Sequence, residues 1–264
     1  MTSDTHTAER IAIGSGEISI RSGGDGPPLL FLHGGGGAGQ WQPAHALLAA
    51  HHRVIAPDHP GFGSSDELPE VEGVDDLVYH YLDVIDHLGL ERPAIVGHSF
   101  GGWVAAEIAV HSPERVGALV LLSPVGLRIP EHPITDIFFV PPREIPAMIF
   151  HDPSALPALD GPPDPDMLLA IYRDSTALAR YTWSPFMANP KLERRLHRIS
   201  APTLVVWPEG DRVVPRAHAE RYVELIPDAR LLTIPECGHA LALERPGEVA
   251  AAIGEFLDET EAGR

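Results

Sequence analysis

Residues 97 to 101 read Gly97-His98-Ser99-Phe100-Gly101, and the segments on either side restrict how this part of the chain can fold. The apolar run Ala94-Ile95-Val96 predicts a strand before the pentad, and residues 102–109 predict a helix after it. A serine on such a strand-to-helix turn projects its hydroxyl from the edge of a sheet. The flanking glycines leave room where strand and helix crowd together. The pentad therefore indicates a nucleophile at a sheet edge.

Strand-like and helix-like segments alternate around this pentad. Nearly continuous Val and Leu in the later runs favour parallel strands covered on both faces. Apolar residues at three- and four-residue steps predict an amphipathic helix over residues 74–88. The alternation predicts an α/β protein with a mostly parallel central sheet flanked by helices. Further strands are expected at residues 10–13, 17–21, 28–32, 53–56, 116–122, 203–207 and 230–234, and further helices at 41–50, 216–225 and 246–258.

Residues 124–200 break this alternation because prolines are frequent there. Proline at this density argues against long helices. Short helices are therefore expected, at residues 143–150, 166–180 and 191–198. Many bulky apolar side chains argue against a disordered linker. We expect residues 124–200 to form an inserted lid subdomain over the sheet edge, and residues 1–123 and 201–264 to form the core.

Composition narrows the range of partners. The 264 residues are enough for one large α/β domain or one domain with an insertion. The formal net charge of −18 argues against binding to nucleic acid or to an anionic membrane surface. The single cysteine, Cys237, excludes an internal disulfide and a cysteine-rich zinc site. A polar N-terminus and the lack of a spanning apolar run predict a cytoplasmic protein.

Two further polar residues follow predicted strands late in the chain. Asp211 comes soon after the strand that ends at Trp207, and His239 follows the strand that ends at Ile234. Residues beyond the carboxyl ends of parallel strands gather at one edge of the sheet. A serine hydroxyl needs a base within hydrogen-bond reach and an acid that orients the base. We therefore predict that Ser99, Asp211 and His239 converge as nucleophile, acid and base.

With this order of Ser, Asp and His, the chain resembles the α/β-hydrolase superfamily, specifically its cap-bearing serine hydrolases, along nearly its full length. Within that superfamily, the chain is similar both to carboxylesterases and to carbon–carbon bond hydrolases. The segments that carry it are Leu32-His33-Gly34-Gly35-Gly36-Gly37, Asp58-His59-Pro60-Gly61-Phe62-Gly63-Ser64-Ser65, the pentad with Gly102, Gly210-Asp211-Arg212-Val213-Val214-Pro215 and Cys237-Gly238-His239.

The resemblance implies an oxyanion hole and no metal or organic cofactor. One oxyanion donor is expected to be the Phe100 N–H, directly after the nucleophile. The other is expected from the glycine loop, where we favour Gly35 over its neighbours Gly34 and Gly36. The apolar lid suggests a small or medium hydrophobic substrate. The lid residues expected to contact this substrate are Phe138, Met148, Trp183 and Phe186.

Other residues could fill the same catalytic roles. His33, His59 and His98 also lie near the sheet edge, but the family pattern makes His33 and His98 supporting residues that brace loops. Some relatives take the acid from the strand before the cap. Here that position reads Leu122-Ser123-Pro124 and offers no carboxylate, which favours Asp211.

The leading functional prediction is hydrolysis of a small-molecule carboxylic ester through an acyl-enzyme on Ser99. Carbon–carbon bond hydrolases of ring-cleavage products are an alternative that keeps the serine. They typically carry Trp after the catalytic histidine and a cap arginine that binds the substrate acid. In this chain Ala240 follows the catalytic histidine, and Arg173 and Arg180 are the arginines available in the cap. Lactonase or perhydrolase activity and a noncatalytic ligand-binding role are further alternatives.

Overall fold

The central element of the fold is one twisted sheet, seen in a computed structural model that describes residues 6–155 and 164–263. Its strand order is β1-β2-β4-β3-β5-β6-β7-β8. An antiparallel hairpin of β1 and β2 forms one edge, and β2 pairs antiparallel with β4, while the remaining neighbours pair in parallel. The strands are β1 Thr7–Ile13, β2 Gly16–Gly23, β3 Pro28–Leu32, β4 Arg53–Pro57, β5 Ala94–His98, β6 Ala118–Leu122, β7 Thr203–Pro208 and β8 Ala229–Ile234.

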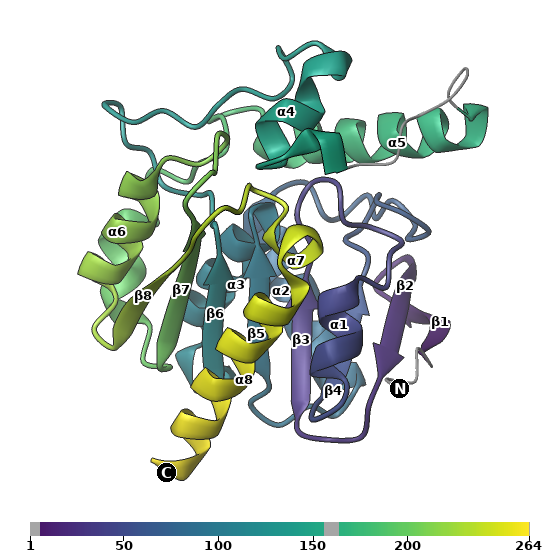
Figure 1. Ribbon diagram of the computed structural model, residues 1–264. Coiled ribbons are helices and arrows are strands. Elements are labelled where there is room, and N and C mark those ends of the chain that lie inside the picture. The colour runs from purple at the N-terminus through teal and green to yellow at the C-terminus, as the bar shows by residue number, and fades with distance from the viewer. Residues whose placement is uncertain (1–5, 156–163, 264) are drawn as a thin grey trace.

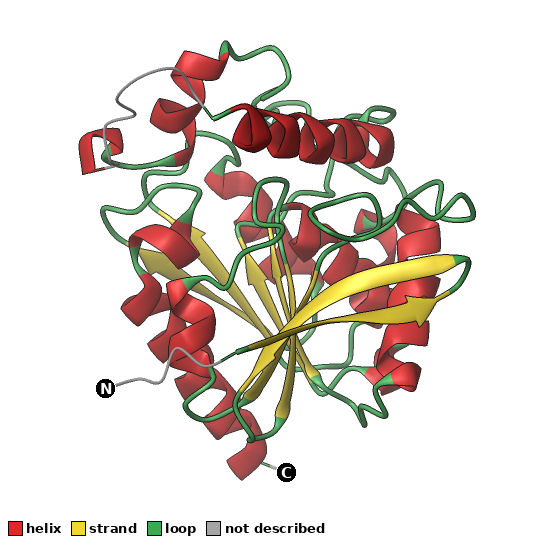
Figure 2. Ribbon diagram, turned by 90° about the vertical axis from the view of Figure 1, so that its right-hand side faces the viewer, coloured by secondary structure: helices red, strands yellow, loops and turns green. Residues whose placement is uncertain are grey.

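Helices cover both faces of the sheet (Figures 1 and 2). Helices α1, α7 and α8 lie on one face, and α2, α3 and α6 lie on the other. The α-helices of these two layers are α1 Pro43–Leu48, α2 Val74–His87, α3 Phe100–His111, α6 Arg216–Leu225, α7 Leu241–Glu244 and α8 Pro246–Ala262, and a short 3-10 turn, η1 Pro113–Arg115, follows α3. This arrangement confirms the predicted α/β architecture.

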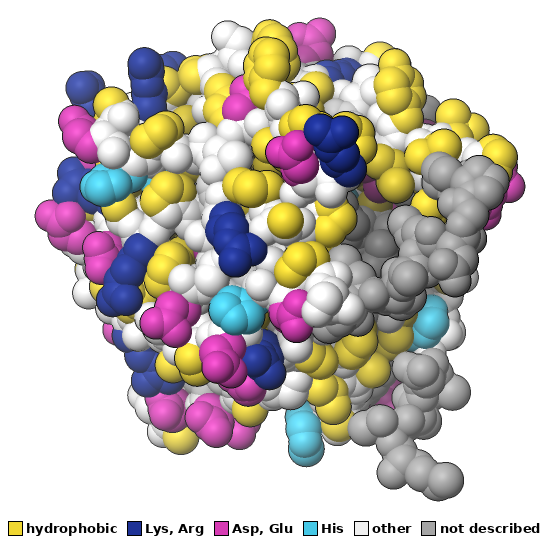
Figure 3. All heavy atoms as spheres, turned by 45° about the horizontal axis from the view of Figure 1, so that its top comes forward, with side chains coloured by type: hydrophobic (Ala, Val, Ile, Leu, Met, Phe, Trp, Pro, Cys, Tyr) yellow, Lys and Arg dark blue, Asp and Glu magenta, His cyan; other side chains and the backbone are white. Residues whose placement is uncertain are grey.

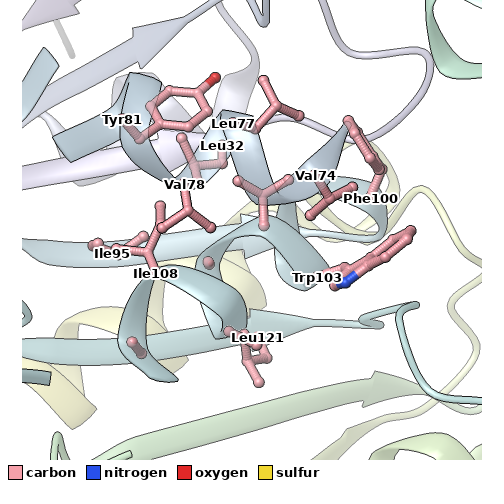
Figure 4. Packing of buried hydrophobic residues seen from close by; sticks show 14 of the residues in the cluster. Leu32, Val74, Leu77, Val78, Tyr81, Ile95, Phe100, Trp103, Ile108 and Leu121 are labelled. Atoms are coloured by element: carbon pink, nitrogen blue, oxygen red, sulfur yellow. The ribbon is translucent and has the colours of Figure 1, made fainter. Parts of the chain in front are cut away.

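The alternation of side chains along the parallel strands creates two separate cores. On β5, Ile95 packs with α2 and α3, whereas its neighbour Val96 points to the face covered by α8. On β6, Leu121 and Val120 divide in the same way. Figure 4 shows the first of these cores, with residues of α2 and α3 packed over Ile95 and Leu121. Because both faces are covered, residues 94–96 of β5 and all five residues of β6 are apolar, which explains their unbroken apolar runs.

The segment between β6 and β7 lies across the upper edge of the sheet in Figure 1, and we call it the inserted segment. It is joined to the rest of the fold partly through a buried carboxylate: Glu107 of α3 accepts hydrogen bonds from Trp103 Nε1 at 3.1 Å and from Asn189 Nδ2 at 2.7 Å. Its helices are η2 Pro142–Glu144, α4 Ile145–Ile149, η3 Pro153–Ala155, α5 Pro165–Thr182 and η4 Glu193–Arg198.

The helix predicted at residues 166–180 is confirmed as α5, although its 18 residues make it longer than the short helices that the proline density indicates. Its prolines flank the helix and do not interrupt it. Pro165 is at the first helical position, where a missing N–H costs nothing. The Asp164 side chain caps the helix by accepting from the Asp166 N–H at 3.0 Å. The next proline, Pro185, comes only after the helix has ended.

The outer surface of the inserted segment carries apolar side chains. Phe139, Leu169 and Tyr172 are 78%, 67% and 72% exposed. Figure 3, which brings this side of the molecule forward, shows hydrophobic side chains spread among charged ones. Within residues 6–155 and 164–263, no helix has the length and apolarity needed to cross a membrane.

A buried histidine in α2 should make the stability depend on pH. His80 is 4% exposed, its Nε2 has no partner among the described residues, and burial lowers its pKa from 6.5 to about 4. The unfolded chain therefore binds a proton that the folded chain does not bind between these two pH values. The stability that neutral, buried His80 allows is fully present above pH 6.5, and the free energy of unfolding falls as the pH drops toward 4.

We predict that His80→Phe flattens the pH dependence of unfolding. Between pH 6 and pH 4.5, the slope of unfolding free energy against pH should fall by about 1.4 kcal/mol per pH unit, which corresponds to one proton. Urea unfolding at several pH values measures this slope. The matched control is His87→Phe on the same helix, because His87 is exposed to water and should leave the slope unchanged. Equal slopes for wild type and His80→Phe would contradict the prediction.

Candidate active site

The predicted catalytic residues and the glycine loop follow the carboxyl ends of parallel strands. Ser99 comes directly after β5, Asp211 follows β7, His239 follows β8, and the glycine loop that begins at Gly34 follows β3. These strand ends form the edge of the sheet that faces α4 and α5 in Figure 1. The topology thus brings together residues that lie up to 140 positions apart in the sequence.

Ser99, His239 and Asp211 are joined by hydrogen bonds. The Ser99 hydroxyl lies 2.9 Å from His239 Nε2, and His239 Nδ1 lies 2.9 Å from Asp211 Oδ2. Because the carboxylate can only accept, Nδ1 carries the imidazole proton and Nε2 is free to accept the serine proton. This tautomer is the one that a general base needs. The main chain of His239 is held as well, since His98 Nε2 donates to its carbonyl at 2.8 Å.

The turn at Ser99 is strained and tightly packed. Ser99 has φ 51° and ψ −110°, a conformation that side-chain-bearing residues rarely adopt. A Cβ at Gly101 would lie 2.2 Å from the Leu32 carbonyl oxygen, and a Cβ at Gly97 would lie 2.3 Å from the Gly101 carbonyl oxygen. The strand and helix therefore approach to a distance that only glycine permits. This packing holds the serine in its strained turn.

The Asp211 carboxylate accepts four hydrogen bonds. Its Oδ1 accepts the N–H groups of Val213 and Val214, both at 2.8 Å. Its Oδ2 accepts from His239 Nδ1 and from the hydroxyl of Ser123. Burial by itself raises the pKa of Asp211, but the attraction of His239 and these hydrogen bonds outweigh it and leave the pKa below its usual value. The aspartate is therefore an anion at neutral pH.

A buried network braces the glycine loop. His33 Nε2 accepts the His59 N–H at 3.0 Å, so its Nδ1 carries the proton and donates to the Gly34 carbonyl at 2.6 Å. His59 Nε2 donates to the His33 carbonyl at 2.9 Å, and its Nδ1 accepts from the hydroxyl of Tyr81. Burial lowers the pKa of both histidines, which keeps them neutral. Both rings thus have a defined tautomer that holds the loop next to Ser99.

The two expected oxyanion donors are the N–H groups of Phe100, directly after the serine, and of Gly35 in the glycine loop. The Phe100 N–H is in the first turn of α3, so no acceptor within the helix is available to it. Within the described part of the chain, neither this N–H nor that of Gly35 donates to a protein acceptor. Gly35 also lies beneath α5, because a Cβ there would be 2.5 Å from Leu178 Cδ2.

The inserted segment is bonded to the loops that carry the acid and the base. Thr135 is hydrogen-bonded to the Asp211 loop. Its N–H donates to the Val213 carbonyl, and its hydroxyl donates to the Arg212 carbonyl. The Ala240 N–H donates to the Ile149 carbonyl at 3.1 Å. On the opposite side, the Gly63 N–H donates to Asp174 of α5 at 2.9 Å. The segment is therefore fixed above the sheet edge from both sides.

The four predicted substrate contacts all belong to the inserted segment. Phe138 stands 6.2 Å from Trp183 and 6.3 Å from Phe186 between ring centroids, so these three form an aromatic cluster. Met148 lies on α4 and packs against the core. Trp183 is 59% exposed. Their contact with a substrate stays a prediction.

Two residues that contact the site were not identified from the sequence. Ser123 stands where a carboxylate was sought, and its hydroxyl bonds to Asp211. Glu244 of α7 accepts the N–H groups of Gly238 at 2.6 Å and His151 at 2.8 Å, which ties the His239 loop to the inserted segment. The position of Ser123 directly after a buried strand was a signal for the first. The four-residue helix that carries Glu244 has no periodicity that could indicate the second.

Comparisons with known proteins agree with this architecture. The sequence profile of the Alpha/beta hydrolase family matches residues 29–252. The chain is 31% identical to the 2-hydroxy-6-oxononadienedioate/2-hydroxy-6-oxononatrienedioate hydrolase of Comamonas testosteroni over 267 residues, covering 90% of each protein. It is 32% identical to the 2-hydroxy-6-oxo-6-(2'-aminophenyl)hexa-2,4-dienoic acid hydrolase of Metapseudomonas resinovorans, covering 97% of this chain and 92% of that protein. The structure of a meta-cleavage product hydrolase from Pseudomonas fluorescens IP01 superposes with a TM-score of 0.80 at 26% identity, covering 95% and 97% of the two chains.

We predict that Gly101→Ala destabilises the folded protein. The added methyl would press on the carbonyl oxygens of Leu32 and His33, at 2.2 and 2.6 Å, which belong to the main chain and cannot rotate away. The free energy of unfolding should fall by about 3 kcal/mol or more. Thermal and urea unfolding measure this loss.

The matched control is Gly254→Ala in α8, where a Cβ would meet nothing within 4 Å. A helix gains up to about 1 kcal/mol when an interior glycine becomes alanine, so this variant should be as stable as wild type or more stable. If Gly101→Ala behaved like Gly254→Ala, the tight packing of the serine turn would be refuted.

Proposed function

Because the chain belongs to the Alpha/beta hydrolase family, we propose that this hydrolase uses Ser99 as nucleophile, His239 as general base and acid, and Asp211 as the residue that orients His239. The single observation that carries this assignment is the continuous pair of 2.9 Å contacts from Ser99 Oγ through His239 to Asp211. Nucleophile, base and orienting acid within hydrogen-bond reach are the arrangement that acyl transfer requires.

We further propose that the bond it cleaves is a carbon–carbon bond next to a ketone, in a product of aromatic ring cleavage. The relatives at 31% and 32% identity over at least 90% of this chain carry the names of hydrolases of 2-hydroxy-6-oxo dienoic acids. The meta-cleavage product hydrolase at TM-score 0.80 shares the fold over nearly the whole chain. These comparisons favour the carbon–carbon alternative over ester hydrolysis, which was the leading prediction from the sequence.

The proposed reaction follows from the geometry of the three side chains. Ser99 Oγ adds to the ketone carbon while His239 Nε2 takes the hydroxyl proton. The carbon–carbon bond then breaks, its electron pair moves onto the departing carbon and into the adjoining conjugated system, and His239 gives that carbon the proton it took from Ser99. The acyl group remains on Ser99. Water, deprotonated by His239, releases it as a carboxylic acid and restores the serine.

The oxyanion hole and the lid belong to the same proposal. The N–H groups of Phe100 and Gly35 would stabilise the negative oxygen that forms when Ser99 adds to the carbonyl. The inserted segment, residues 124–200, would act as the lid that shapes the substrate cavity over a core of residues 1–123 and 201–264. Support for this comes from Leu178, which α5 places directly against Gly35. Phe138, Met148, Trp183 and Phe186 would supply the apolar contacts.

Ester hydrolysis is a second candidate, favoured by how this chain uses its arginines. A dienoic acid carries a carboxylate that a cation would recognise. Arg173 instead donates to the main-chain carbonyls of Gly61 and Ser65, at 3.3 and 2.6 Å. Arg180 donates to the Val71 carbonyl at 2.9 Å. Ala240 stands where the carbon–carbon hydrolases typically have Trp. A neutral ester needs neither a cation nor that aromatic side chain.

We predict that the enzyme turns over 2-hydroxy-6-oxo-6-phenylhexa-2,4-dienoate to benzoate and 2-hydroxypenta-2,4-dienoate. Decay of the absorbance of the conjugated substrate measures the rate, and chromatography identifies the two products. Ser99→Ala should reduce kcat by about 10³-fold or more, because removal of a nucleophile leaves only the oxyanion hole and substrate binding.

A parallel assay with p-nitrophenyl butyrate separates the two candidate functions. Carbon–carbon hydrolysis requires kcat/KM for the dienoate to exceed that for the ester. A reversed preference would overturn that part of the proposal in favour of ester hydrolysis. If Ser99→Ala kept full activity on whichever of the two substrates wild type turns over, Ser99 would not be the nucleophile in either candidate function.

A further inference from the structure

We propose that Ser123 is a positioning residue for Asp211. The Ser123 hydroxyl fixes the Asp211 carboxylate, and this carboxylate orients His239. The inference rests on the proposed function, because it assigns a role within the same group of residues. Ser123 directly follows β6, and β6 lies between β5, which leads to Ser99, and β7, which leads to Asp211. Nothing of its side chain reaches solvent.

The contacts of Ser123 connect the acid to the base. Its hydroxyl donates to Asp211 Oδ2, the same oxygen that accepts from His239 Nδ1. Ser123 Oγ also lies 3.4 Å from His239 Nδ1. A hydroxyl has one proton, and the anionic oxygen is the stronger acceptor, so that proton is directed at Asp211. Ser123 thus restricts Oδ2 on the side opposite Val213 and Val214, which hold Oδ1.

The main chain around Ser123 also links the acid to the nucleophile. The Ser123 N–H donates to the Val206 carbonyl on β7 at 2.8 Å. The preceding carbonyl, of Leu122, accepts the Ser99 N–H at 2.9 Å. Residues 122 and 123 therefore hold the backbone of the nucleophile and the side chain of the acid from one short segment. A hydroxyl at this position has a fixed relation to both.

The backbone conformation of Ser123 indicates that the hydroxyl, rather than the fold, requires this residue. Ser123 has φ 44°, in the left-handed region where glycine is favoured. A glycine there would relieve the strain and keep the Val206 hydrogen bond, but it would remove the hydroxyl. A strained residue whose side chain is bonded to a catalytic group is the expected sign of strain kept for function.

The test compares Ser123→Gly with wild type through the reactivity of Ser99. A fluorophosphonate reacts with an activated serine whichever bond the enzyme naturally cleaves, and mass spectrometry of the Ser99 peptide measures the rate. We expect Ser123→Gly to unfold at the same temperature as wild type or higher, yet to be phosphonylated about tenfold more slowly, since a hydrogen bond to a charged group is lost. Any substrate turned over should show the loss in kcat and not in KM.

A double-mutant cycle shows whether Ser123 acts through Asp211. In an Asp211→Asn background, Ser123→Gly should have little further effect on the phosphonylation rate, because the carboxylate that it positions is gone. An equal loss in both backgrounds would overturn the proposal. So would wild-type reactivity of Ser123→Gly.

Two further measurements keep the result independent of the proposed function. Arg92→Gly is the matched control: Arg92 also has a positive φ, 48°, and lies away from the site, so its removal should leave the phosphonylation rate unchanged. The proton NMR resonance of His239 Nδ1–H, which needs no turnover, should shift in Ser123→Gly. An unchanged resonance would contradict the positioning role. Failure of wild type to react with the fluorophosphonate would instead contradict Ser99 as nucleophile.

Discussion

The close approach of β5 and α3 at Gly97 and Gly101 is the constraint on which the site depends. Main-chain oxygens occupy the space that a Cβ at either glycine would need. The turn between strand and helix is therefore sharp, and Ser99 takes a strained conformation at its tip. The same packing brings the end of β3, and with it the Gly34–Gly35 loop, beside the serine. Nucleophile and expected oxyanion donors thus owe their positions to one contact.

Hydrogen bonds to main-chain and buried groups then limit how far each catalytic side chain can move. Four donors surround the Asp211 carboxylate, the His239 carbonyl is held by His98, and His33 and His59 hold the glycine loop in defined tautomers. Such groups are already oriented before substrate binds, so little reorganisation is needed as charge develops. The inserted segment lies across the same sheet edge and is hydrogen-bonded to loops on both sides of it.

Much of this could be predicted from the sequence because it depends on local patterns and parallel topology. Residues that follow parallel strands meet at one edge, so the convergence of Ser99, Asp211 and His239 followed from their positions. The helix at residues 166–180 was predicted to within two residues, and prolines do not shorten it because Pro165 stands at its first position. Ser123 was passed over because only a carboxylate was sought there. The packing of the inserted segment, on which we propose that substrate choice depends, is encoded by no local pattern.

The central claim is that Ser99 carries the acyl group during turnover. The most direct measurement mixes the enzyme with p-nitrophenyl butyrate or the phenyl dienoate, quenches it in acid within milliseconds and maps the acylated peptide by mass spectrometry. The account predicts a butyryl or benzoyl group on the peptide that contains Ser99, and none on the Ser99→Ala protein. Turnover with the acyl group on a different residue, or with no acyl-enzyme at any quench time, would contradict it.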